Sequence, residues 1–151
     1  MQNLGDVFAH FIREDAELPV PAGKSRTSFV DARDLGEAAG QLLLSEAPHS
    51  NALELTGPES LTYHEVARVL SRELYRPVEY TEPSGKEFEV RATEAGWEPG
   101  YITVVSRLFL TVRLGMAKKV SSDLESVLGR PPRGLAEYVA DKREIWQQAS
   151  D

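Results

Sequence analysis

The segment TSFVDARDLGEAA, residues 27–39, decides how the chain is interpreted, because it joins an expected strand to an expected helix. Its first residues are mostly β-branched or aromatic and complete a strand expected over residues 24–30. Asp31 then has the side chain of a helix N-cap, and Asp34 adds a carboxylate to the first turn. The helix is expected to run to about Glu46. Its buried stripe is expected to consist of Leu35, Ala38, Ala39, Leu42 and Leu43.

Strands and helices alternate on both sides of this segment, and helices dominate after residue 84. A Pro/Gly connector is expected at residues 18–23. Further short strands are expected at residues 52–56 and 77–81, and further helices at 3–13, 62–75, 84–95, 101–116, 122–129 and 135–147. Three of these helices begin with a capping-box pattern, at Thr62–Glu65, Ser84–Glu87 and Ser122–Glu125. We therefore expect an α+β or partial α/β fold, with few short strands and about six helices, in a single domain spanning residues 1–151.

Composition excludes several classes of function. The 151 residues include 17 Lys and Arg against 24 Asp and Glu, a formal net charge of −7, so nucleic acid is not an expected partner. There are no cysteines, which excludes disulfides, thiolate metal sites and a cysteine nucleophile. No apolar run reaches the roughly 20 residues that a bilayer crossing needs, and we expect no membrane partner. The first residues lack a signal-peptide pattern, which fits a cytoplasmic protein.

No local motif for binding a nucleotide phosphate is present. The 11 glycines form no GxGxxG, GxxGxxG or GxxxxGK pattern. Gly36 and Gly40 lie four residues apart in an expected helix, where close packing of that helix on a sheet is the expected reason. Tyr138 and Lys142 form a YxxxK pair, the spacing with which short-chain dehydrogenases lower a tyrosine pKa. Five tyrosines and five lysines make a chance match common, so a surface helix is the expected explanation.

Other candidate catalytic groups are scattered. His10, His49 and His64 lie in separate elements, so no metal site is expected. No serine lies in a GxSxG pattern. Arg130, Arg133 and Arg143 are expected to form a solvated face. The catalytic residues are therefore unknown from the sequence.

Two segments offer more apolar surface than three short strands can cover. One is the helical face formed by Leu4, Val7, Phe8, Phe11 and Ile12, and the other is the helix at residues 101–114. The two could pack on each other. Alternatively, they could form a pocket wall or an intermolecular interface.

Several ordered motifs resemble those of NmrA-like proteins, atypical members of the short-chain dehydrogenase/reductase superfamily. VDARDLGEAA at residues 30–39 resembles the strand-to-helix step of the family. LTGPE at residues 55–59, followed by LTYHEVA at 61–67, matches a second motif. GRPP at residues 129–132 resembles the segment before the last helix of the family, and MQNL at residues 1–4 resembles the end of an internal motif. The chain departs from the family at Tyr75, where glycine is usual, and at Gly134, where serine or threonine is usual.

The resemblance implies that this chain is the C-terminal, substrate-binding half of an NAD(P)H-dependent reductase. The acceptor of the hydride would be quinone-like or otherwise conjugated. Met1, Gln2 and Asn3 would border the cleft for nicotinamide and substrate, and Asp31 and Asp34 would cap a helix. The N-terminal dinucleotide-binding half would be lacking, so we expect no NAD(P)H binding and no activity from this chain alone.

Two further expectations follow from the missing half. The first is a homodimer, or a strand exchange, through residues 1–31, with Leu4, Val7, Phe8, Phe11 and Ile12 at the interface. The second is an alternative function, a non-catalytic NmrA-like regulatory or protein-interaction module.

Overall fold

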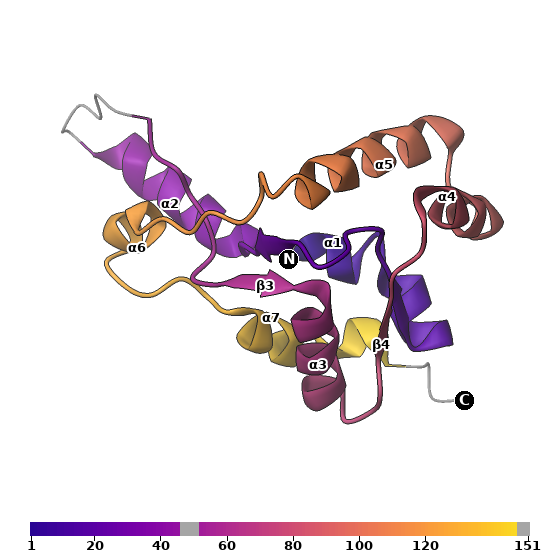
Figure 1. Cartoon of the computed structure of the whole chain (residues 1–151). Coiled ribbons are helices and arrows are strands. Elements are labelled where there is room, and N and C mark those ends of the chain that lie inside the picture. Colours follow the sequence, from indigo (N-terminus) through magenta and orange to yellow (C-terminus); the bar gives the residue numbers. More distant parts are fainter. Residues whose placement is uncertain (46–51, 148–151) are drawn as a thin grey trace.

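Figure 1 shows the computed structural model of the chain, which describes residues 1–45 and 52–147. Helices make up most of it, as expected for an α+β chain with few short strands. The helical elements are α1 (Gln2–Gly5), the π-helical η1 (Phe11–Asp15), α2 (Ala32–Leu44), α3 (Tyr63–Leu74), α4 (Gly85–Glu94), α5 (Pro99–Arg113), α6 (Asp123–Leu128), α7 (Leu135–Asp141) and the 3₁₀-helical η2 (Arg143–Trp146). The strands are β1 (Glu17–Pro19), β2 (Arg26–Ser28), β3 (Ser60–Thr62) and β4 (Glu79–Thr81).

The strands form two small sheets. β1 pairs in parallel with β4, with Glu17 opposite Glu79, and β2 pairs antiparallel with β3, with Arg26 opposite Thr62. The strands expected at residues 24–30 and 77–81 are confirmed by β2 and β4, whereas β1 lies where a connector was expected. The strand expected at 52–56 is wrong for the described chain. No described strand lies beside it, and the Glu54 amide donates to the Asp123 carboxylate at 2.8 Å instead.

Local capping residues set most helix starts. Asp31 caps α2 by accepting from the Arg33 amide at 2.9 Å. The reciprocal capping boxes expected at Thr62–Glu65 and Ser84–Glu87 are both formed. The box expected at Ser122 is wrong, because the Ser122 side chain makes no cap bond and the Asp123 amide is bound by the Ser121 hydroxyl at 3.1 Å.

The single helix expected at residues 3–13 is broken into α1 and η1. Gly5 packs so closely on Tyr138 that an added Cβ would lie 2.9 Å from the tyrosine hydroxyl. The chain turns after this contact, and the Phe8 amide reaches back five residues to the Asn3 carbonyl at 3.0 Å. Ala16 then ends η1 in the left-handed conformation, with φ 56°. The break allows Phe8 and Phe11 to enter the same core.

The apolar face at the start of the chain packs on the helix at 101–114, as the first of the alternatives expected, and residues of both also line a cavity, as the pocket-wall alternative expected. Phe8 and Phe109 of α5 have ring centroids 5.9 Å apart, and Phe8 and Trp97 are 6.0 Å apart. Of the residues expected at a dimer interface, Leu4, Phe8, Phe11 and Ile12 are buried inside this chain and Val7 is half-buried. They are covered by the chain's own core and offer little surface to a partner. The homodimer stays a prediction and would need other residues.

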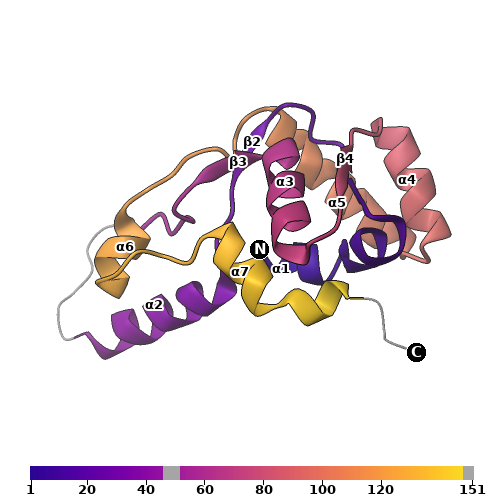
Figure 2. The same cartoon turned by 90° about the horizontal axis from the view of Figure 1, so that it is seen from below.

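Helix α2 projects from the body with α6 beside it, as Figures 1 and 2 show. Ala38 packs with Leu124 and Leu128 of α6 in a second, smaller apolar cluster. The expected stripe along α2 is therefore mostly wrong: only Ala38 is buried, and Leu43 is 86% exposed. The close packing expected at Gly36 and Gly40 is also wrong, because nothing lies within 4 Å of a Cβ added at either. The predicted end of this helix at Glu46 lies outside the described residues.

Candidate functional site

A partly open cavity of about 330 Å³ lies between the start of the chain, β2, α3 and α5. Figure 1 shows α5 running above the strands and the N-terminus below it. Most of the wall is apolar. The lining side chains that carry the argument are Phe8, Phe29, Tyr63, Leu108 and Phe109, and Met1, Gln2 and Asn3 also line the cavity. The structure thus brings the three residues expected at a cleft into one wall. It adds residues of β2 and α3 that the sequence did not assign to a site, and residues of α5, the helix that the sequence suggested as a pocket wall.

Polar side chains from β2 and from the start of the chain interrupt this apolar wall. Thr27 and Ser28 line it, and their hydroxyl oxygens are buried without a hydrogen-bond partner among the described residues. A buried, unpaired hydroxyl costs roughly 1–3 kcal/mol. Because successive side chains of a strand point to opposite faces, at most one of these hydroxyls faces the cavity directly, and a ligand with an oxygen acceptor would satisfy that donor. The cavity therefore suits a flat, apolar molecule that carries a carbonyl or similar acceptor.

Tyr63 forms the aromatic floor of the cavity. Its ring lies edge-on to Phe29 at 5.6 Å and to Phe109 at 6.1 Å. Burial raises the pKa of Tyr63 to about 12, and the Thr27 hydroxyl beside the phenol acts in the opposite direction. The phenol is therefore neutral at physiological pH and can donate a hydrogen bond.

The start of the chain is held against the cavity by Asp31. Gln2 donates from Nε2 to Asp31 Oδ1 at 3.0 Å and accepts from the Ala32 amide at 3.1 Å. The backbone nitrogen of Met1 donates a hydrogen bond to the Val30 carbonyl at 2.7 Å. Arg33 completes the arrangement with a donor to Asp31 Oδ2 at 2.7 Å. Asp31 thus both caps α2, as expected, and positions the wall that contains Met1 and Gln2.

The buried Asp31 carboxylate should make stability depend on acid. Burial acts to raise its pKa, but hydrogen bonds from Arg33 and Gln2 outweigh burial and hold the pKa below its usual value. A depressed folded pKa stabilises the protein above the unfolded pKa of about 3.9, and this contribution is lost as the pH falls through the folded value. We expect the stability difference between the unchanged chain and Asp31→Asn to be constant from about pH 6 to 8 and to shrink below about pH 4. Urea unfolding at several pH values measures it. A difference that stays constant down to pH 3 would contradict this role.

Asp34 does not cap α2, contrary to the expectation. It is fully buried and accepts from the Arg133 amide at 2.7 Å, from Arg130 Nη2 at 2.8 Å and from Arg133 Nη1. The solvated face expected for Arg130 and Arg133 is therefore wrong, because both guanidinium groups anchor the segment before α7 to α2. Arg143 lies over the Tyr75 ring at 4.9 Å.

The Tyr138–Lys142 pair is not a catalytic pair. Tyr138 is buried against Trp146, with ring centroids 6.1 Å apart. Burial and the nearby Asp6 and Asp31 raise the pKa of Tyr138 to about 12. A catalytic pair would lower that pKa, so the YxxxK spacing here is structural, although Tyr138 is a core residue and not the surface residue expected.

The described residues do not fit the pyrophosphate of NAD(P)H. The N-terminal ends of α2, α3 and α4 are occupied by the carboxylates of Asp31, Glu65 and Glu87. These carboxylates would repel a phosphate at the position where helix amides usually bind one. No group of three or more His, Asp or Glu side chains in residues 1–45 and 52–147 could hold a metal ion. His10 and His64 contact the rings of Phe11 and Tyr80, and His49 lies outside the described residues.

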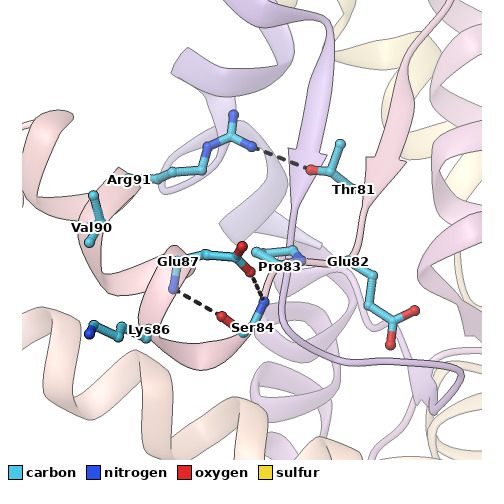
Figure 3. A pocket seen from close by; sticks show the side chains of 8 residues that line it. All are labelled: Thr81, Glu82, Pro83, Ser84, Lys86, Glu87, Val90 and Arg91. Carbon is cyan, nitrogen blue, oxygen red and sulfur yellow. Dashed lines mark hydrogen bonds between the residues drawn. The ribbon is translucent and has the colours of Figure 1, made fainter.

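A larger hollow of about 730 Å³ lies between the end of β4 and α4 (Figure 3). Several of its polar groups are already paired: Ser84 and Glu87 form the capping box, and Arg91 binds Thr81 at 3.5 Å and Glu17 at 2.6 Å. Unlike the smaller cavity, this hollow has no aromatic side chain in its lining, so we do not treat it as the site of a conjugated molecule.

Comparison with known proteins agrees with the motifs. No protein-family model matches the chain. The chain is 32% identical over 138 residues to an NAD(P)H azoreductase of Xenophilus azovorans and 28% identical over 135 residues to the uncharacterized oxidoreductase YesF of Bacillus subtilis. Its fold superposes with a TM-score of 0.83 on an NADPH-dependent quinone oxidoreductase of Escherichia coli at 21% identity, covering 89% of this chain and 49% of that one. The chain corresponds to the C-terminal half of an NmrA-like protein.

The NmrA-like chain spans about half the length of the relatives it matches. Its aligned residues are 91% of this chain and 48% of the azoreductase, and 89% of this chain and 47% of YesF. The residues that the resemblance placed at a cleft, Met1 to Asn3, line the cavity described above. The sequence did not point to Thr27, Ser28 or Tyr63. The only signal for them was that they lie in or beside the two quoted motifs.

Proposed function

We propose that this NmrA-like chain carries the acceptor-binding side of an NAD(P)H-dependent reductase, and that the 330 Å³ cavity holds a quinone-like or other conjugated acceptor. The observation that supports this most directly is a mostly aromatic and aliphatic wall in which a few polar side chains, from Gln2, Asn3, Thr27 and Ser28, are set. A quinone offers two flat apolar faces and carbonyl oxygens at its edge, which match this wall and these polar side chains.

The names of the relatives support the same class of acceptor. The matched proteins include an azoreductase, a quinone oxidoreductase and a triphenylmethane reductase. Each of these names refers to a conjugated compound that the protein reduces. The cofactor would be held outside the residues described here, since the N-termini of α2, α3 and α4 are occupied by carboxylates. We therefore expect the chain to bind an acceptor without consuming NADPH.

The double variant Thr27→Val and Ser28→Ala tests the proposal. Valine keeps the shape of threonine, so the cavity stays while both donors are lost. We expect the dissociation constant for a small quinone such as menadione to rise about tenfold, since each hydrogen bond contributes roughly 0.5–1.5 kcal/mol. Thermal stability should not fall, because the lost hydroxyls are unpaired in the free protein. Titration calorimetry measures the binding and a thermal melt measures stability.

Thr103→Val is the matched control, because the Thr103 hydroxyl bonds to the Pro99 carbonyl at 3.0 Å on the exposed side of α5. It should leave quinone binding unchanged. A chain that binds no quinone, or a double variant that binds as well as the unchanged chain, would contradict the proposed site. Mixing the chain with the nucleotide-binding half of the azoreductase then tests turnover. Stable association without NADPH consumption would favour the interaction-module alternative.

A further inference from the structure

Helix α5 presents a broad apolar face to solvent. Tyr101, Val104, Leu108, Leu110 and Leu114 are between 45% and 70% exposed, and Met116 just beyond the helix is 72% exposed. The opposite side of α5 is buried in the core through Ile102, Val105, Phe109 and Val112. Figure 1 shows α5 along one edge of the molecule with no described element beyond it, and in Figure 2 it lies on the far side from α7. A helix that is apolar on nearly all sides normally has cover on all sides.

The charge of this region is opposite to that of the chain. Residues 99–122 contain no Asp or Glu and four basic residues, in a chain of net charge −7. Lys119 pairs with Glu54, whereas Arg107, Arg113 and Lys118 have no acidic partner among the described residues. A second copy of the same helix would bring like charges together. An anionic surface would instead be attracted to this face.

The polar groups on the outer face are already satisfied inside the helix. Thr103 donates to the Pro99 carbonyl at 3.0 Å, and Thr111 donates to the Leu108 carbonyl at 2.7 Å. Moving them out of water therefore costs less than moving a free hydroxyl. Arg107 lies between the apolar residues, and a flexible arginine side chain can extend to a lipid headgroup while its stem stays in an apolar layer.

The width of the apolar face also favours a flat surface, such as that of a bilayer, over a single helix as its partner. The exposed apolar residues occupy positions 101, 104 and 108 on one side of the helix and 110 and 114 on the other, with Arg107 between them. A coiled-coil partner needs a narrow seam at heptad spacing, which this pattern does not provide. A helix lying in the surface of a bilayer buries about half of its circumference.

From these features we infer that α5 binds the surface of an anionic lipid bilayer, with the helix axis in the plane of the membrane. No described helix has the length and apolar character to cross a bilayer, so the association is with the surface. This revises the expectation of no membrane partner, which rested only on the lack of a spanning segment. The inference does not depend on the proposed reductase function.

Vesicle flotation with the full chain tests this inference. We expect the chain to float with vesicles of phosphatidylglycerol and phosphatidylcholine, to stay unbound with phosphatidylcholine alone, and to dissociate as salt is raised. The double variant Leu110→Glu and Leu114→Glu should weaken binding by about tenfold or more, and Arg107→Gln by about fivefold. All three side chains are exposed, so the variants should keep the far-UV circular dichroism of the unchanged chain.

The matched control is Leu43→Glu with Leu44→Glu, the same chemical change at exposed leucines of α2. It should leave vesicle binding within about twofold, because these residues lie outside the basic segment. No flotation with phosphatidylglycerol at low salt would overturn the inference, as would equal losses in the α2 and α5 variants. A dimer in sedimentation velocity that the α5 variant dissociates, together with no vesicle binding, would assign the face to a second copy.

Discussion

Gly57→Ala is expected to destabilise the protein by about 3 kcal/mol or more, because the new methyl group has no room. A Cβ at Gly57 would lie 1.6 Å from the Phe29 carbonyl oxygen and 2.5 Å from its carbon, so two backbone segments would have to separate. No side-chain rotation relieves such a contact. Phe29 also lines the cavity, and its displacement should weaken quinone binding as well. Urea unfolding and calorimetry of the variant measure both effects.

Gly36→Ala and Gly40→Ala are the controls, because a Cβ at either position of α2 meets nothing within 4 Å. Each should stabilise the protein by about 0.5–1 kcal/mol through the higher helix propensity of alanine. If Gly57→Ala proved as harmless as these two, the close approach of the LTGPE segment to β2 would be wrong.

Asp34→Ala is expected to cost about 3 kcal/mol of unfolding free energy. The carboxylate is fully buried, and its loss leaves the Arg133 amide without its acceptor and takes one carboxylate partner from each of the Arg130 and Arg133 guanidinium groups. Arg130 and Arg133 are themselves partly exposed and can regain water, which places the cost at the low end for a buried ion pair. The midpoint of urea unfolding should fall at an unchanged m-value.

Glu37→Ala is a control with the same partner in a different environment. Glu37 also binds Arg130, but it is an exposed residue, so its loss should cost less than about 1 kcal/mol. Equal losses in the two variants would show that burial of Asp34 is not what makes its ion pairs important.

The sequence was sufficient to predict a residue's structural role where its hydrogen-bond partners lie within a few positions along the chain. The caps at Asp31, Thr62 and Ser84 and the left-handed end of α6 at Gly129 (φ 68°) depend on atoms at most three or four residues away. The resemblance to NmrA-like proteins likewise used short motifs in order. These features fix where the helices begin, but not what covers them.

The sequence was insufficient where the partner is remote. Asp34 meets Arg130 and Arg133 across 96 and 99 residues, and nothing in the local pattern distinguishes it from a second capping carboxylate. The break between α1 and η1 depends on Tyr138, which packs against Gly5 from the other end of the chain. The cavity is assembled in the same way from the start of the chain, β2, α3 and α5, so no single segment could reveal it.

The two apolar clusters give the chain two regions of unequal resistance to local unfolding. The cluster of Ala38, Leu124 and Leu128 is small, and α2 exposes two leucines beside it. The main cluster contains most of the aromatic rings and joins both halves of the sequence. Segments with few buried contacts open at a lower free energy than the whole molecule. The outer part of α2 can therefore separate from α6 while the walls of the cavity stay in place, and Asp34, bound to the segment before α7, marks the boundary between the two regions.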